Sequence, residues 1–166
     1  MLELQKLSDH YQVRRMQDTD ADAILALCLQ NTQYYQYCGK QPSRELILND
    51  LHITPPGIGP SDKYYTGFYS ETDLAAVLDL IDGYPDQNAC WISFFMMNKR
   101  LQGRQLGTEI IQHLCRYLRE AGYTMLRLGI DKDNPQSTHF WKKNGFRVVR
   151  EVKQDEGTIL VAEKAL

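Results

Sequence analysis

The sequence predicts a mixed α/β (α+β) domain whose central, mostly antiparallel sheet has about six or seven strands flanked by helices. Its 166 residues, 43% of them hydrophobic and 24% charged, suit a single globular domain over residues 1–166. Short apolar segments with turn signals between them indicate strands, and apolar residues at helical spacing indicate helices. The predicted order is a strand, two helices, three strands, a helix, a strand, a short helix and two strands.

The first half begins with a predicted strand over residues 11–16. Asp and Thr residues then start a helix over residues 17–30, which has apolar residues at helical spacing (Ala23, Ile24, Leu27 and Cys28). A tyrosine-rich connection, NTQYYQYCGKQPS, leads to a second helix from Ser43, its expected N-cap, to about Leu51. The Pro- and Gly-rich stretch HITPPGIGPSD is predicted to be a loop.

Strands are predicted for KYYTGFYS, DLAAVLDLI, ACWISFFMM and TMLRLGI. The nearly all-apolar run from Trp91 to Met97 is expected of a strand that is buried on both faces. Between the last two strands, residues 107–122 carry a helical apolar stripe that ends at a glycine. A short helix is expected over residues 135–144, with Asn134 as its N-cap and Pro135 at its first position. RVVREVK and TILVAEK form a closing hairpin around residues 155–157.

The composition excludes several classes of function. A net charge of −2 gives no reason to expect nucleic acid as a partner. No apolar run approaches the roughly 18 residues of a membrane span, and MLELQKLSDHYQ does not resemble a secretory signal, so we expect a cytoplasmic protein with no membrane partner. The four cysteines form no CxxC pair and no cluster with histidine at metal-ligand spacing, so free thiols and no metal are expected.

The segment NKRLQGRQLGTEII joins a buried strand to the start of a helix. Free backbone N–H groups and the helix dipole make such a turn an anion site, and glycines let the backbone approach a phosphate closely. Neither the P-loop pattern GxxxxGK[ST] nor the dinucleotide pattern GxGxxG is present. An ordinary strand-to-helix turn therefore stays an alternative on this segment alone.

Together, two segments carry a family resemblance. QGRQLG resembles the Q/R-x-x-G-x-G/A loop of the GNAT (Gcn5-related N-acetyltransferase) family, except that Gln105 stands where the first motif glycine is usual. Further on, the strand TMLRLGID, Asn134 and HFWKKNGF resemble the second half of the family pattern, which usually reads FYxKxGF. The resemblance implies an acyl-CoA N-acyltransferase fold, in which two parallel strands splay apart to form the cofactor cleft.

The resemblance also implies a set of cofactor contacts, with acetyl-CoA as co-substrate. Backbone groups of Phe95, Met96 and Met97 would meet the acetyl carbonyl and the pantetheine arm. Asn134 would bond to that arm, and Phe140 and Trp141 would line the wall near the sulfur, although core packing is the alternative for the aromatic residues. The pyrophosphate would lie on the backbone of Gln102, Gly103, Arg104, Gln105, Leu106, Gly107 and Thr108.

The catalytic acid departs from the family pattern, because Trp141 occupies the position of the family's usual tyrosine and an indole is no general acid at neutral pH. Either a water or another hydroxyl would then protonate the leaving thiolate, or its release would need no acid. The hydroxyl groups that could replace the missing tyrosine are those of Tyr84, Tyr34, Tyr35 and Tyr37. Candidate bases are Asp79 and Asp82, at the end of their strand, where a solvated turn acid is the alternative for Asp82. The candidate catalytic residues are Asp82, Tyr84 and Trp141.

The expected reaction is transfer of an acetyl group to a primary amine of a small molecule or peptide, by direct attack on the thioester. Tyrosines and aspartates in the variable segments would suit a cationic or amphipathic amine, and an ordinary tyrosine-rich surface is the alternative. Two alternatives stay open: a non-catalytic acyl-CoA-binding or sensor domain, and an enzyme that uses a different acyl donor. Members of the family are often dimers, so a homodimer is one assembly that the resemblance implies.

Overall fold

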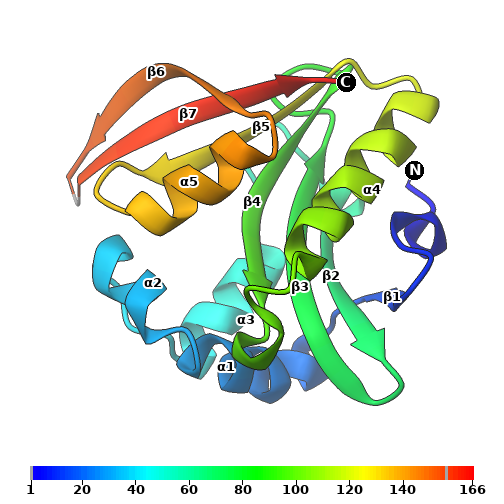
Figure 1. Cartoon of the computed structure of the whole chain (residues 1–166), viewed down its shortest axis with the longest axis vertical. Helices are drawn as coiled ribbons and strands as arrows, with labels where there is room; N and C mark the ends of the chain where they lie inside the picture. Colours follow the sequence, from blue (N-terminus) through cyan, green and yellow to red (C-terminus); the bar gives the residue numbers. More distant parts are fainter. Residues whose placement is uncertain (1, 156) are drawn as a thin grey trace.

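A computed structural model describes residues 2–155 and 157–166. One mixed sheet of seven strands, in the order β1-β2-β3-β4-β5-β7-β6, forms its centre (Figure 1). All neighbouring strands are antiparallel except β4 and β5. The strands are β1 (Gln12–Arg15), β2 (Lys63–Ser70), β3 (Asp73–Asp82), β4 (Ala89–Met97), β5 (Met125–Asp131), β6 (Arg147–Gln154) and β7 (Gly157–Ala165).

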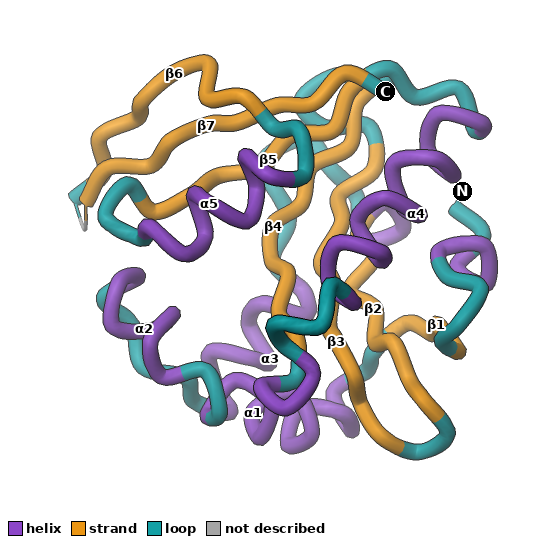
Figure 2. Tube along the Cα trace, in the orientation of Figure 1, coloured by secondary structure: helices purple, strands orange, loops and turns teal. Residues whose placement is uncertain are grey.

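Helices cover both faces of this sheet, as the purple segments of Figure 2 show. α4 and α5 pack on one face over a core that includes Phe68, Leu78 and Leu114, and α1 and α3 pack on the other over Ile24, Ile47 and Val77. The helices are α1 (Ala21–Leu29), α2 (Thr32–Cys38), α3 (Arg44–His52), α4 (Leu106–Glu120) and α5 (Pro135–Lys143), with short 3-10 turns η1 (Leu4–Leu7), η2 (Asp18–Asp20), η3 (Pro60–Asp62) and η4 (Lys99–Leu101).

The predicted fold class is confirmed, with one helix more than expected. The tyrosine-rich connection contains α2, which ends at Gly39 in the left-handed conformation (φ +68°). Ser43 and Asn134 cap α3 and α5, since their side-chain oxygens accept hydrogen bonds from the N–H groups of Leu46 and Ser137. The closing hairpin of β6 and β7 is present, and Glu156, which belongs to the predicted turn, lies outside the described residues.

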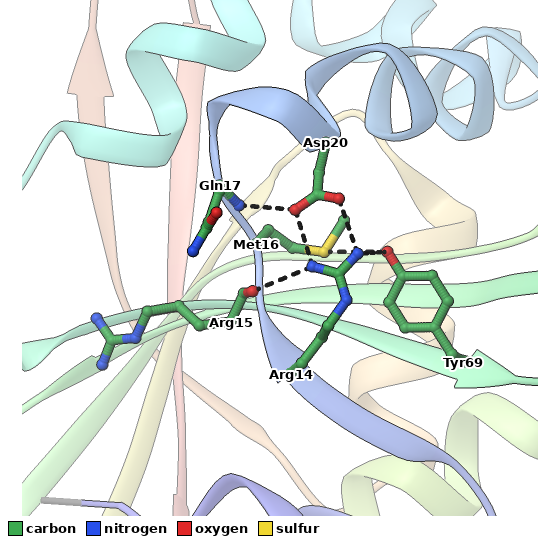
Figure 3. Close-up of polar contacts among 6 residues, drawn as sticks. All are labelled: Arg14, Arg15, Met16, Gln17, Asp20 and Tyr69. Atoms are coloured by element: carbon green, nitrogen blue, oxygen red, sulfur yellow. Dashed lines mark hydrogen bonds and ion pairs between the residues drawn. The ribbon is translucent and has the colours of Figure 1, made fainter. Parts of the chain in front are cut away.

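The turn from β1 into α1 is fixed by a cluster of polar contacts (Figure 3). The guanidinium group of Arg14 donates to both carboxylate oxygens of Asp20, at 2.7 and 2.8 Å, and to the hydroxyl of Tyr69 at 2.8 Å. Asp20 also accepts a hydrogen bond from the backbone N–H of Gln17 at 2.8 Å. Bidentate arginine–carboxylate pairs constrain geometry, so this cluster sets the direction in which α1 leaves the sheet.

Within residues 2–155 and 157–166, no helix is long and apolar enough to cross a membrane. The same residues contain no group of three or more His, Cys, Asp or Glu side chains placed to hold a metal ion. The four cysteines are free, with Cys38 partly exposed and the other three buried.

Candidate functional site

The parallel strands β4 and β5 pair only over their first halves. Their register runs from Ala89 opposite Met125 to Ile92 opposite Leu128 and then stops, so the strands separate (Figure 1). Beyond Ile92, β4 remains paired with β3 alone. The gap explains why the run that was expected to be buried on both faces includes the exposed Ser93.

The backbone of β4 turns polar groups into this gap. The N–H of Asn98 bonds to Ala75 on the β3 side, whereas the carbonyl of Met97 accepts from the Asn31 side chain on the other side. Because such groups alternate along a strand in an antiparallel pair, the N–H and C=O of Phe95 also face the gap. A hydrogen-bond donor and acceptor are thus available where the two strands part.

A β-bulge at Ser93 sets the faces of the residues that follow. Asp79 is opposite Phe94 in the register, but Leu80 is opposite Ile92, so Ser93 is an extra residue in β4. The bulge places Phe94 on the same face as Asp79, toward α3, and Phe95 on the face toward α4. A cavity lies on each face.

The first, which we call the α4-side cavity, has a volume of about 330 Å³. The lining residues that were not predicted as cofactor contacts are Asn31, Gln33, Tyr34, Lys99, Leu101, Gln136, Ser137, His139 and Lys143. Of the predicted cofactor contacts, Arg104 and Leu106 are not among the lining residues. The structure brings the rest together at this cavity: Phe95, Met96, Met97, Gln102, Gly103, Gln105, Gly107, Thr108, Asn134, Phe140 and Trp141.

The glycine-containing loop turns sharply before α4. Gly103 has φ +76° and Gln105, the N-cap of α4, has φ +64°. The N–H groups of the first turn have no intrahelical acceptor, and the Gln105 side chain does not cap them. Together with the helix dipole, and with Lys99 and Lys143 among the lining residues, they favour an anion here.

Gly107 leaves room for the cavity beside the first turn of α4. A Cβ built at this position would lie 3.3 Å from Cγ of Met97 and 3.5 Å from the ring of Phe140. Any larger side chain would therefore occupy space between these two residues. The absence of a side chain keeps the backbone of α4 open to a ligand.

An aromatic cluster forms the wall opposite α4. Phe95 stacks on Phe140 with ring centroids 5.9 Å apart, and Trp141 contacts Phe140 at 5.0 Å and Phe146 at 5.1 Å. Phe140 and Trp141 line the cavity, and Trp141 and Phe146 both belong to the buried core, against which Phe140 packs. Phe140 and Trp141 are therefore placed to line a ligand site, and their contact with a cofactor stays a prediction.

Two amide side chains position the walls. The side chain of Gln102 donates to Asn31 at 2.6 Å and to the Met97 carbonyl at 3.3 Å, which links the glycine loop to the α1–α2 junction and to β4. Asn134 uses its oxygen to cap α5, while its NH₂ group has no hydrogen-bond partner among the described residues and the residue lines the cavity. Asn134 can thus cap the helix and contact a ligand simultaneously.

The second, or α3-side, cavity has a volume of about 650 Å³ and opens on the other face of the gap. Its walls combine aromatic and aliphatic side chains with five charged residues. The charged lining residues are Lys40, Asp50, Lys63, Asp79 and Asp131. The other lining residues are Tyr34, Tyr35, Cys38, Leu46, Ile53, Thr54, Pro55, Pro56, Trp91, Ser93, Phe94, Gly129, Gln154, Gly157 and Ile159.

At the base of this cavity lies a buried ion pair. Nζ of Lys63 is 2.6 Å from Oδ2 of Asp79, and the two side chains are only 4% and 5% exposed. The other oxygen of Asp79, Oδ1, is buried without a hydrogen-bond partner among the described residues. Burial raises the pKa of Asp79 to about 6, although the nearby Lys63 ammonium lowers it in part. Burial likewise raises the pKa values of Asp50 and Asp131.

Tyr34 of α2 lines both cavities at the open end of the gap. Its ring packs edge-on against Tyr35 and Phe94, with centroids 5.1 and 5.8 Å away. Burial raises the pKa of the Tyr34 hydroxyl far above its ordinary value, so the group stays protonated at neutral pH.

The profile of the acetyltransferase (GNAT) family matches residues 26–146 of the sequence. The chain belongs to this family. A search of curated proteins finds no match. Solved structures with the same fold include an acetyltransferase from Thermus thermophilus, which is 21% identical over 94% of this chain and 97% of its own, with a TM-score of 0.75.

Two further similar structures were determined with coenzyme A. The PaiA N-acetyltransferase of Thermoplasma acidophilum is 16% identical over 94% of this chain and 99% of its own, with a TM-score of 0.66. RimL, a ribosomal L7/L12 α-N-protein acetyltransferase, is 18% identical over 99% and 98%, with a TM-score of 0.74. At these identities the likeness shows a shared GNAT fold and leaves the acceptor unassigned.

The geometry does not support two of the three candidate catalytic residues in this GNAT domain. Asp82 pairs with Cys90 near the start of β4, about 20 Å along the strand from Met97, and accepts a hydrogen bond from the Tyr123 hydroxyl at 2.6 Å. Tyr84 packs on Trp91 at 5.8 Å and lines neither cavity. Only Trp141 lies at the α4-side cavity.

Sequence reasoning missed the charged residues Asp50, Lys63 and Asp131 of the α3-side cavity. Lys63 begins β2 and resembles an ordinary surface residue until its register neighbours are known. Asp131 is the last residue of β5. A carboxylate at the end of the strand that separates from β4 was the sequence signal that could have identified it. Asp79 was weighed as a base, and the structure places it in this cavity.

Proposed function

We propose that this GNAT domain is an acetyl-CoA-dependent N-acetyltransferase that moves an acetyl group to a primary amine of a small molecule or peptide. The observation that supports this most directly is the α4-side cavity, which joins an anion-binding helix start to the open backbone of β4. A cavity of about 330 Å³ suits the pantetheine arm, and the nucleotide would lie outside it.

In this proposal, the turn before α4 binds the pyrophosphate. The N–H groups from Gln102 to Thr108 supply donors, and the left-handed backbone at Gly103 and Gln105 turns the loop toward the helix axis. Lys99 and Lys143 add positive charge at the rim. Arg104 and Leu106 contribute only their backbone, because their side chains do not line the cavity.

The gap in the sheet positions the thioester. Met97 and Phe95 offer backbone groups to the pantetheine and acetyl oxygens, and the N–H of Phe95 is the donor best placed for the oxygen that gains negative charge. Asn134 donates to the pantetheine arm through its NH₂ group. Phe140 and Trp141 exclude water from the region of the sulfur.

Bound acetyl-CoA supplies an activated acyl carbon for direct attack, so the protein must deliver a neutral amine and accept a thiolate. Neutralising an alkylamine with a pKa near ~10.4 costs roughly 4–5 kcal/mol at pH 7. A carboxylate on the acceptor side is the natural aid. Trp141 cannot protonate the thiolate, and the hydroxyl of Tyr34, which lines both cavities, takes that place in the proposal.

The alternative is a GNAT domain that binds acyl-CoA without turnover. The observation in its favour is that Trp141 replaces the usual tyrosine, so the cavity lacks the hydroxyl group at that position. The two functions differ in a single measurable property, because only the enzyme releases CoA when an amine is present.

Thermal unfolding with and without acetyl-CoA tests the shared cofactor site. At ~100 times its dissociation constant a ligand adds about 2.7 kcal/mol to stability, which corresponds to about 5–11 °C for a domain of this size. ATP, which lacks the pantetheine arm, is the control ligand and should produce a much smaller shift. No shift at millimolar acetyl-CoA would refute the site, and a shift without CoA release for any amine would favour the non-catalytic domain.

A further inference from the structure

The α3-side cavity is a built site with one unmet polar group. Asp79 lines it with a side chain that is only 5% exposed, and its Oδ1 has no hydrogen-bond partner among the described residues. A buried carboxylate oxygen without a hydrogen-bond donor is destabilising, so a donor at this position is favoured. Lys63 already occupies the other oxygen, so the missing donor must come from the cavity.

The charges around the cavity favour a cation. Three carboxylates and two ammonium groups line it, which leaves one net negative charge among the described residues. Asp50 and Asp131 come from α3 and β5, on opposite sides of the opening. One added ammonium group would bring the set to neutrality, whereas an anionic acceptor would add to the excess negative charge.

The remaining walls are apolar. Tyr34, Trp91 and Phe94 present aromatic rings, and Ile53, Pro55 and Ile159 present aliphatic surface. Aromatic faces also attract an ammonium group. A volume of about 650 Å³ is in the range of small-molecule sites, so the cavity suits a compact body better than a long chain.

We infer that the α3-side cavity binds a small arylalkylamine-like acceptor as its ammonium ion, and that Oδ1 of Asp79 removes one proton from it. The inference rests on the proposed acetyltransferase function and adds the acceptor class and the base. Asp79 and Phe94 are register partners, and Phe95 beside them turns its backbone into the gap, so the amine lies next to the thioester position.

The step balances as follows. Asp79 takes one proton from the ammonium group, and the neutral nitrogen forms a bond to the acetyl carbon while the carbon–sulfur bond breaks. The nitrogen loses a second proton, which the sulfur gains, with the hydroxyl of Tyr34 placed to relay it. The products are an amide and a thiol, and Asp79 returns one proton to solvent.

The electrostatics of Asp79 agree with this role. Burial raises its pKa to about 6, so the carboxylate is ionised at pH 7.5 and is still basic enough to accept a proton. Groups that influence or face it come from every neighbouring element: Lys63 and Tyr65 from β2, Asp50 from α3, Tyr34, Tyr35 and Cys38 from α2, Lys40 after α2, and Asp131 from β5.

The test compares tyramine with tyrosine, which differ only in a carboxylate. Wild-type protein with saturating acetyl-CoA should acetylate tyramine at least ~10-fold more efficiently, in kcat/KM, because the cavity is already negative. Asp79→Asn should lower kcat/KM for tyramine ~10²-fold or more and remove the limb of the pH profile near pH 6. Asp73→Asn, an exposed carboxylate on the same strand, is the matched control and should behave as wild type.

Asp79→Asn leaves Lys63 buried without its partner and therefore risks misfolding. The double variant Lys63→Met/Asp79→Leu replaces the pair with apolar groups of similar size, a change that is often neutral for stability. It should melt near the wild-type temperature, keep the acetyl-CoA shift and lose tyramine acetylation. Retained activity with an unchanged pH profile in this variant would overturn the inference.

Two further outcomes separate this inference from the proposed function. Acetylation of a peptide N-terminus without acetylation of tyramine would overturn the acceptor class and leave the acetyltransferase in place. Failure to bind acetyl-CoA would refute the proposed function, and calorimetric titration of tyramine into wild type and Asp79→Asn would then still decide the cavity's preference. Equal affinity for tyramine in both proteins, or none in either, would overturn it.

Discussion

Replacement of Lys63 by methionine isolates the energetic role of the buried ion pair. The pair is 2.6 Å long and its side chains are 4% and 5% exposed, so the substitution leaves Asp79 as a buried charge without its counterion. Breaking a buried pair from one side costs about 3–5 kcal/mol. For a domain of this size, the expected fall in melting temperature is about 6–20 °C at pH 8.

The loss should depend on pH in a defined direction. The pKa of Asp79 is about 6 in the folded protein against 3.8 as its ordinary value, so the fold prefers the protonated acid. This group contributes stability that is present below pH 3.8 and lost as pH rises through 6, about 3 kcal/mol in total. Removing Lys63 raises the pKa of Asp79 further, so the penalty of the variant is largest at pH 8 and falls below about 1 kcal/mol at pH 4.5.

Urea unfolding, monitored by tryptophan fluorescence at pH 8 and pH 4.5, measures the loss of stability and its dependence on pH. The control is Lys6→Met, because Lys6 and Glu3 form an ion pair of 2.8 Å with side chains 60% and 66% exposed. That variant should change stability by less than about 0.5 kcal/mol at either pH. An equal loss for Lys63→Met at both pH values, or a loss below about 1 kcal/mol at pH 8, would show that solvent reaches the pair and that the reasoning fails.

Three other substitutions probe the cofactor side. Gln105→Gly should raise stability by up to about 1 kcal/mol in urea unfolding, since a left-handed non-glycine residue costs about 1–2 kcal/mol and glycine returns part of this as entropy. Gly107→Ala should leave the melting temperature within a few degrees but weaken acetyl-CoA binding about 10-fold or more in calorimetry, because the new methyl group lies 3.3 Å from Met97. Tyr34→Phe should lower kcat about 10²-fold with little change in acetyl-CoA affinity, if its hydroxyl protonates the thiolate.

Each has a matched control. Gln105→Ala keeps the left-handed strain and should gain nothing, so an equal gain would contradict the explanation from backbone strain. Gln112→Ala changes an exposed residue of the same helix as Gly107 and should bind acetyl-CoA normally. Tyr37→Phe removes a hydroxyl from the same helix as Tyr34 but outside both cavities, and comparable loss in both variants would refute the specific role of Tyr34.

Local signals predicted most of the secondary structure. Asn134 and Ser43 were identified as caps from residue type and position, and both accept the expected backbone hydrogen bonds. α2 was missed because TQYYQYC has no apolar stripe and no side-chain cap, although Gly39 after it was an available stop signal. α2 places Tyr34 at both cavities. Because this helix was missed, nothing in the sequence favoured Tyr34 over the other candidate tyrosines.

The acceptor side depended on information that the sequence does not display. Asp79 and Asp82 are three residues apart on one strand, and the sheet register decides which one meets Lys63 and which one meets Tyr123. The bulge at Ser93 exists only relative to the register with β3. Gln105 looked like a departure from the glycine pattern, but its positive φ shows that the loop keeps the backbone shape that glycine would adopt.

The single extra residue at Ser93 has a consequence for how relatives of this chain can diverge. Substitutions along the second half of β4 adjust the size or polarity of either cavity wall one residue at a time. Deleting Ser93 would remove the bulge and leave Phe94 opposite Asp79, so the side chains of Phe94 to Met97 would keep their faces. A one-residue shift of these residues against β3 would instead move their side chains to the opposite faces and exchange the walls of the two cavities. The register with β3 thus constrains this strand more than its length does, and variation in acceptor choice is expected from residue exchange or from α2 and α3.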